Sequence, residues 1–204
     1  MNDISTNNKL QRVFYKQEVT IVAKNLLGKV LVKNDKNYTL AGKIVEVEAY
    51  HGDFDEAAHS FKGKTNRTEV MFNEGGYLYV YFTYGAHFCC NVVTGKKEQG
   101  TAVLIRAVEP LIGIEIMIKN RFGRKLKNEK EIFNLTSGPG KVCKAFNINT
   151  SCSGLDLLGD KIFILDEKKI NKKYIGISKR IGITRSVDLP WRFFIKDNSF
   201  LSRK

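Results

Sequence analysis

The chain has 204 residues, of which 34 are Lys or Arg and 21 are Asp or Glu, giving a net charge of +13 at neutral pH. This length suits one domain with a sizeable core, and no apolar run approaches the ~20 residues of a bilayer-spanning helix. The basic excess favours a polyanionic partner such as a nucleic acid. An anionic membrane surface and a plain solubility margin are the alternatives.

The spacing of apolar residues predicts an α+β fold. Residues 1–12 are polar and without an apolar signal segment, so we expect a flexible tail and a cytoplasmic protein, nucleoid-associated if bacterial. No linker interrupts residues 13–204, which we take as a single domain. The stretch EVTIVAKNLL predicts a helix that Gly28 ends.

Further elements follow in chain order. Helices are expected from Pro110 to about residue 121 and over residues 142–146. Alternating residues predict strands at 29–34, 43–50, 77–84, 102–108, 161–165 and 192–195. Strands without regular intervening helices favour a largely antiparallel or mixed sheet over a doubly wound one.

The four cysteines, Cys89, Cys90, Cys143 and Cys152, lack the spacing of a metal site. We expect buried free thiols in a reducing cytosol, and neither a metal nor a cofactor. Phosphate-loop, zinc-protease and serine-hydrolase motifs are also missing from the sequence.

The segment IVEVEAYHGDFDEAAHS carries a concentration of reactive side chains. In a regular strand Ile44, Glu46, Glu48 and Tyr50 would share one face. Two carboxylates on one face repel unless they are solvated or used, so an edge strand in water and a carboxylate directed into a site both stay open. His59 adds an imidazole, although a hydrogen-bonded histidine without a functional role is the simpler interpretation.

The segment GGYLYVYFTYG places Tyr77, Tyr79 and Tyr81 on one face of a strand. These rings are either half-buried sheet residues or the wall of a slot for a flat ligand. Tyr84 and Gly85 stand where the strand should bend, and a tyrosine on such a turn is suited to wedge between bases.

The segment SGPGKVCKAF resembles a phosphate-binding loop only loosely. Its backbone amides and Lys141 are suited to hold a DNA phosphate at a helix start, and a plain helix N-cap is the alternative. The basic stretches KNRFGRKLK and KKINKKYIGISKR are either backbone-tracking surfaces or solvated faces.

Six segments in order, VEVEAYHGDFDEAAHS, YLYVYFTYG, CCNVVT, AVLIRAVEPL, SGPGKVCKAF and DLPWRFF, together resemble the alkyladenine (3-methyladenine) DNA glycosylases. The resemblance implies one compact α+β domain with a curved, mainly antiparallel sheet and packed helices, working without a metal or organic cofactor. It also implies the removal of alkylated or deaminated purines from double-stranded DNA.

The same resemblance implies residue roles. Glu48 would be the general base that activates water, and Arg106 would help to hold that water. Tyr50, His59 and Tyr81 would stack around the extruded base, Asn91 would disfavour normal guanine, and Tyr84 would enter the duplex. The sequence departs from the family pattern at Ala86 and His87, where a bulkier pair can occur, and it suggests no role for Glu46.

Two other functions are weighed beside a monofunctional glycosylase. One is a non-catalytic module that binds distorted or damaged nucleic acid, and the other is a glycosidase that acts on sugars or nucleosides. We expect a monomer that needs no membrane and no obligate protein partner. A Schiff-base lysine, and hence strand cleavage, is not predicted.

Overall fold

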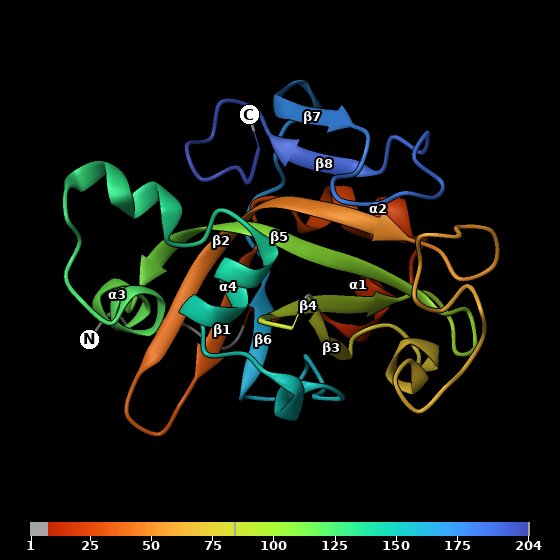
Figure 1. Ribbon diagram of the computed structural model, residues 1–204. Helices are drawn as coiled ribbons and strands as arrows, with labels where there is room; N and C mark the ends of the chain where they lie inside the picture. The colour runs from red at the N-terminus through yellow and green to blue at the C-terminus, as the bar shows by residue number, and fades with distance from the viewer. Residues whose placement is uncertain (1–7, 84, 204) are drawn as a thin grey trace.

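The computed structural model describes residues 8–83 and 85–203, in which helices pack around one curved antiparallel sheet (Figure 1). The strands are β1 (Val30–Asn34), β2 (Thr39–Tyr50), β3 (Leu78–Thr83), β4 (His87–Thr94), β5 (Thr101–Ile112), β6 (Ile162–Leu165), β7 (Ile175–Ser178) and β8 (Arg192–Ile195). The sheet order is β3-β4-β5-β2-β1-β6, while β8 pairs with β2 and β7 pairs with β8. The expected α+β class with a curved antiparallel sheet is confirmed.

Helices cover the sheet at several points. They are α1 (Arg12–Tyr15), α2 (Val19–Leu26), α3 (Ile114–Phe122) and α4 (Pro139–Ala145), with short 3-10 helices η2 (Glu69–Phe72), η3 (Glu129–Asn134), η4 (Thr150–Cys152) and η5 (Lys172–Tyr174). Helix α2 packs on β2 and β5, and α4 packs on β4 and β5. None of the helices within the described residues is long and apolar enough to cross a bilayer.

Helix α2 shows how the sequence encodes these contacts. Val19, Val22, Ala23 and Leu26 are all buried, in the i, i+3, i+4, i+7 spacing of one helix face. The Glu18 carboxylate accepts hydrogen bonds from the first free amides, which satisfies donors that the helix itself cannot. The helix is therefore defined by its own sequence and was predicted closely.

Other predicted elements need correction. Pro110 does not begin a helix but lies in β5 opposite Gly42, next to a register shift. Strand β4 pairs only with residues 101–104 of β5, so Pro110 lies on a stretch with one strand partner, where its missing N–H is tolerated. Helix α3 begins later, after Gly113. Strands β4 and β7 were not predicted.

The beginning of the described chain also differs from expectation. Leu10, expected in a flexible tail, is buried, and its amide donates to the Ile164 carbonyl of β6 at 2.9 Å. Lys9 forms an isolated bridge with Leu165 on the same strand. Residues 9 and 10 therefore lie along β6, and the buried side chain of Leu10 adds to the hydrophobic core.

Strand β2 changes its alternation halfway along. Opposite β5, Ile44 pairs with Val108 and Glu46 with Ala107, so Val45 is an extra residue. Ile44 therefore joins Val47 and Ala49 in the main apolar cluster, while Glu46 and Glu48 face a polar network. The expectation that Ile44 shares a face with the two glutamates was wrong, because a bulge cannot be read from regular spacing.

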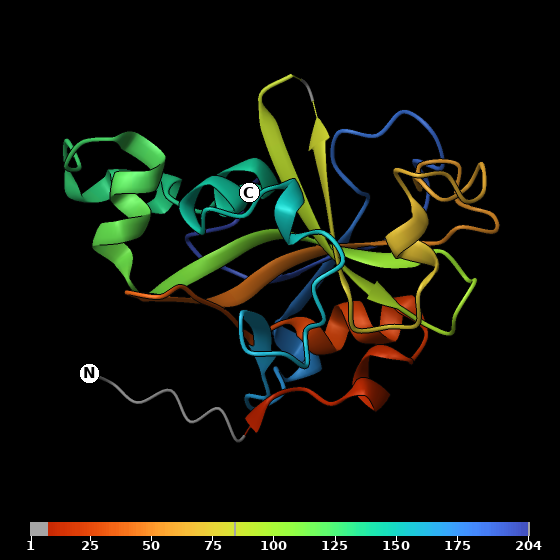
Figure 2. The same cartoon turned by 90° about the horizontal axis from the view of Figure 1, so that it is seen from below.

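Strands β3 and β4 form a hairpin that projects from the rest of the sheet (Figure 2). Tyr84, the residue expected to enter DNA, lies outside the described residues, between Thr83 at the end of β3 and Gly85. Gly85 adopts a positive φ of 64°, a conformation that glycine enters without strain.

Candidate active site

A cavity of about 530 Å³ opens beside β3, β4 and β5, a volume typical of sites for small ligands. Its wall is aromatic on one side, from Tyr50, His59, Tyr79 and Tyr81. Asn91 and Arg106 add polar groups, and the loop of residues 181–185 also lines the cavity. The site is thus assembled from at least four separate segments of the chain.

Sheet register explains why these segments meet. Pairing across the strands β3, β4, β5, β2 and β8 aligns one row of residues, Tyr79, Asn91, Leu104, Glu48 and Arg192. Directly paired residues point to the same face of a sheet. The row therefore connects Tyr79, in the aromatic wall, with the buried carboxylate of Glu48 along one face of the sheet.

The aromatic wall is a packed set of rings. Tyr79 and Tyr81 are stacked with ring centres 5.6 Å apart, and His59 meets Tyr81 edge to face at 4.3 Å. The His59 Nδ1 lies 3.1 Å from the Tyr79 hydroxyl. These contacts hold the rings in place before any ligand arrives.

His59 is kept uncharged at neutral pH. Burial against the tyrosines, and then the nearby Arg67 guanidinium, lower the pKa of His59 to about 4. Although part of the residue is exposed, both effects oppose a proton on the ring. The imidazole therefore presents a neutral face to the cavity.

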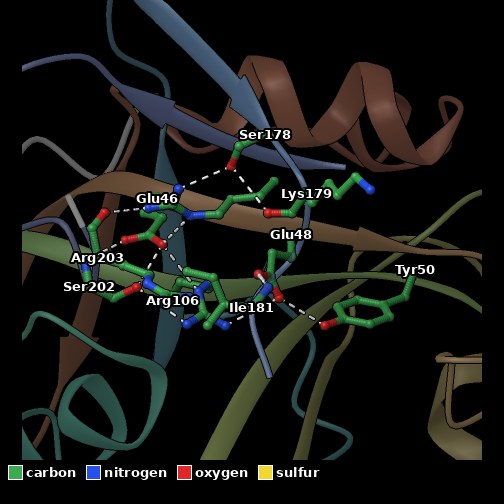
Figure 3. A network of polar contacts seen from close by, with 10 residues as sticks. Glu46, Glu48, Tyr50, Arg106, Ser178, Lys179, Ile181, Ser202 and Arg203 are labelled. Carbon is green, nitrogen blue, oxygen red and sulfur yellow. Dashed lines mark hydrogen bonds and ion pairs between the residues drawn. The ribbon is translucent and has the colours of Figure 1, made fainter. Parts of the chain in front are cut away.

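Glu48 is fully buried, and its carboxylate is bonded to residues of the cavity wall (Figure 3). Its Oε2 accepts hydrogen bonds from the Tyr50 hydroxyl at 2.8 Å and from Arg106 Nη1 at 3.2 Å. Its Oε1 accepts the Ile181 amide at 2.7 Å. All three donors belong to residues that line the cavity, and together they stabilise the carboxylate as an anion.

Tyr50 and Arg106 keep fixed charge states beside Glu48. Burial, followed by the charge of Glu48, raises the pKa of Tyr50 well above its usual value, so the hydroxyl stays a donor. Burial alone would lower the pKa of Arg106, but the adjacent Glu48 and Glu46 outweigh burial and raise it. Arg106 therefore stays a cation shared by two carboxylates.

Of the remaining predicted residues, Asn91 lines the cavity and Lys141 does not. Asn91 is buried in the cavity wall, where its Nδ2 donates to the Tyr79 carbonyl at 3.3 Å. Lys141 does not line the cavity, since its Nζ donates to Asn134 Oδ1 at 3.0 Å and Ser137 Oγ at 3.2 Å. Six of the eight predicted residues thus meet at one site, Lys141 lies apart, and Tyr84 is not described.

Several residues of the site were missed from the sequence. Tyr79, which alternation placed on the face of Tyr81 but which was given no separate role, lines the cavity beside it. Arg180 is buried, pairs with Asp55, and lies with its guanidinium 4.5 Å from the Tyr50 ring centre. The amide of Ile181 carries no side-chain signal at all, so only the fold reveals it.

The cysteines are placed without any metal-binding arrangement around them in the described part of the chain. All four cysteines are free and buried, as predicted. Within residues 8–83 and 85–203, no three His, Cys, Asp or Glu side chains are grouped so that they could hold a metal ion.

Comparison with known proteins gives a consistent result. The family pattern described as Methylpurine-DNA glycosylase (MPG) matches residues 13–199. Relatives that are provisionally named 3-methyladenine DNA glycosylases include one from Alkaliphilus oremlandii, 48% identical over 202 residues and covering 96% of this chain and 100% of its own. Another, from Clostridium novyi, is 48% identical over 203 residues, covering 96% and 99%. A third, from Carboxydothermus hydrogenoformans, is 47% identical over 196 residues, covering 96% and 99%. The chain belongs to the methylpurine-DNA glycosylase family.

Proposed function

We propose that the protein is a monofunctional DNA glycosylase that releases alkylated or deaminated purines from double-stranded DNA by hydrolysis. One observation carries the proposal: the Glu48 carboxylate and the Arg106 guanidinium are paired directly behind a cavity walled by aromatic rings. The chain's charge of +13 suits a DNA substrate. Such a substrate places the protein in the cytoplasm beside the chromosome.

The purine must leave the duplex before the site can act on it. A base inside a stacked helix is unreachable, and flipping it out costs a few kcal/mol, less for a damaged pair. Stacking against aromatic side chains returns about 1–3 kcal/mol per base, and Tyr50, His59 and Tyr81 offer that contact. Tyr84 would fill the space that the base leaves in the duplex.

The aromatic wall also suits the charge of the substrate. Purines alkylated at N3 or N7 are cations, and electron-rich rings attract cations. A protonated histidine would repel such a base, but the pKa of His59, near 4, leaves it neutral at physiological pH. The positive charge on the base further weakens its bond to the sugar.

The hydrolytic step needs one activated water. A carboxylate has about four acceptor positions, and Glu48 uses three of them, with only the Ile181 amide on Oε1. A water donating to the open side of Oε1 would lose its proton to Glu48 as its oxygen bonds to C1′ of the deoxyribose. The bond from C1′ to the purine nitrogen breaks, and its electron pair leaves with the base. The negative charge of Glu48 also stabilises the cationic sugar.

Other residues would set selectivity and DNA contact. Asn91 would oppose the exocyclic amine of normal guanine from the cavity wall. An ammonium has three donors, and Lys141 uses two of them within the protein, so its third N–H would meet a DNA phosphate. The enzyme would act as a monomer.

The deciding experiment measures free base and abasic sites after the protein is mixed with methylated duplex DNA. We expect wild-type protein to release base, and Glu48→Gln to bind the same DNA without releasing it. Glu109→Gln is the matched control, because Glu109 pairs with Lys43 and Asn198 and does not line the cavity. Unchanged release by Glu48→Gln would refute the assigned role.

The same assay separates the two alternative functions. DNA binding by wild-type protein without any base release would indicate a binding module. Release of base from free nucleosides as fast as from duplex DNA would indicate a nucleoside hydrolase, because the duplex would then contribute nothing to the rate.

A further inference from the structure

Glu46 accepts four hydrogen bonds, three of them from residues that do not line the cavity. Its Oε1 accepts Arg106 Nε at 3.1 Å, Arg192 Nε at 2.8 Å and Ser202 Oγ at 2.7 Å, and its Oε2 accepts the Ser202 amide at 2.6 Å. Three of these four donors belong to Arg192 and Ser202, neither of which lines the cavity, and Glu46 is fully buried. Glu46 is therefore directed away from the cavity, whereas all three donors to Glu48, two positions later, line it.

The partners of Glu46 converge on Arg106. Arg106 has three nitrogens, and each meets a different partner: Nε meets Glu46, Nη1 meets Glu48 at 3.2 Å, and Nη2 donates to Ser202 Oγ at 3.3 Å (Figure 3). A planar guanidinium held at three corners can neither rotate nor slide. Glu46 and Ser202 thus determine where Nη1 points.

Arg192 forms hydrogen bonds that hold the segment containing Ser202 in place. Its Nη2 donates to the Arg203 carbonyl at 2.6 Å, and its Nη1 donates to Ser178 Oγ at 3.0 Å. Strand β8 therefore binds both β7 and residues 202–203. Two carboxylates and two guanidinium groups balance one another here, which limits the cost of burying four charges.

We propose that Glu46 and Ser202 are positioning residues, which hold Arg106 in the orientation that reaches Glu48 and the attacking water. Ser202 and Arg203, far from β2 in sequence, are thereby a working part of the active site. The inference rests on the proposed glycosylase function for its kinetic consequence, but the orientation of Arg106 can be measured without turnover.

The first test substitutes Ser202, which leaves the buried charges unchanged. Ser202→Ala removes one donor to Glu46 and the acceptor of Arg106 Nη2, so we expect the single-turnover excision rate to fall about fivefold. DNA affinity should not change, and Ser202→Thr should restore the rate. Ser151→Ala is the control, because its hydroxyl bonds only locally to Asn149. An equal fall in affinity, or no fall in rate, would overturn the inference.

The second test is a double-mutant cycle. Glu46→Gln should lower the rate roughly 10- to 100-fold, by analogy with the loss of partners that orient metal ligands. In an Arg106→Met background the same substitution should cost nothing further, because its effect passes through Arg106. Glu109→Gln should be silent in both backgrounds. A loss of equal size in both would show a general structural role and refute the proposal.

A measurement without substrate distinguishes the two proposals. The Nε–H proton of Arg106 should give a slowly exchanging NMR signal in wild type and a faster one in Ser202→Ala, while Ser151→Ala stays like wild type. An unchanged exchange rate would overturn the positioning role even in an active enzyme. If Ser202→Ala changes the proton exchange rate but the wild-type protein releases no base, the glycosylase function alone would be refuted.

Discussion

The guanidinium of Arg180 lies 4.5 Å from the centre of the Tyr50 ring. Arg180 also pairs with the buried carboxylate of Asp55 and donates to the Ala49 carbonyl at 2.9 Å. One buried ion pair thus joins the loop after β2 to the loop that contributes residues 181–185 to the cavity wall. The ring proposed to stack on a flipped base is backed by this pair.

We first predict that Asp55→Ala strongly destabilises the protein. Removing one partner leaves Arg180 charged in a fully buried position, which costs about 3–5 kcal/mol. For a chain of this size that corresponds to a fall in Tm of about 6–20 °C. Calorimetry measures it, and Asp188→Ala, which breaks the exposed Lys179–Asp188 pair, should leave Tm unchanged. Equal effects of the two substitutions would contradict the prediction.

Tyr50 should contribute through its ring. In a Glu48→Gln background, which prevents excision, Tyr50→Ala should weaken binding to methylated DNA by about 1–3 kcal/mol, because one stacking surface is lost. Binding to undamaged DNA should hardly change. Tyr50→Phe keeps the ring and should bind like the parent. Fluorescence anisotropy reports both affinities, and equal losses for Ala and Phe would argue against stacking.

His59 should make the protein less stable in mild acid. Its pKa of about 4 in the folded chain is below the ordinary value of 6.5, so between these pH values the unfolded chain binds more protons. The free energy of unfolding therefore falls as pH drops from about 6.5 towards 4, and His59 contributes no slope above that window. The slope will be modest, because the residue is partly exposed.

Denaturant titrations across that pH range test the prediction. His59→Gln should flatten the slope, whereas His87→Gln, at the exposed start of β4, should not. An NMR titration of the imidazole that gave a pKa near 6.5 would contradict the argument.

Asn91 should limit attack on normal guanine. We expect Asn91→Ala to release guanine from undamaged DNA roughly tenfold faster than wild type, because the cavity would lose the amide that opposes the exocyclic amine. Release of 3-methyladenine, which lacks the 2-amino group of guanine, serves as the internal reference. Chromatography of the freed bases measures both, and an unchanged ratio would remove Asn91 from selectivity.

Tyr84 should matter only when the substrate is paired. Tyr84→Ala should slow excision from duplex DNA more than from single strands, because a wedge has no gap to fill in an unpaired strand. Phe82→Ala, on the neighbouring exposed strand position, is the control. Equal losses on both substrates would indicate a general packing role.

Much of the site was predicted through the family resemblance, because alternation alone left the direction of Glu48 open and did not predict strand β4, which carries Asn91. Glu48, Tyr50, Tyr81, Asn91 and Arg106 lie on strands, where alternation decides the face of the sheet and register then aligns the rows. A family resemblance spanning several strands located them together.

The rest depends on packing between distant segments. The Ile181 amide, the Arg180–Asp55 pair and Ser202 reach the site through loops whose paths have no local period. Pro110 misled for a related reason. A proline is tolerated both at the start of a helix and on a strand stretch whose N–H side has no partner strand. Which of the two occurs depends on the neighbouring strands, which the local sequence does not reveal.

The extra residue at Val45 has a consequence for how this site can evolve. Upstream of it, Leu40 and Ile44 face the main core, and downstream Val47 and Ala49 do. A regular strand that kept Val45 would put Glu46 and Glu48 on the face of Leu40 and Ile44 and direct both carboxylates into hydrocarbon, whereas deleting Val45 would keep Ile44, Val47 and Ala49 on one face. A related sequence could therefore lose Val45 together with the bulge and still direct both carboxylates to the site, but it could not keep Val45 and lose the bulge.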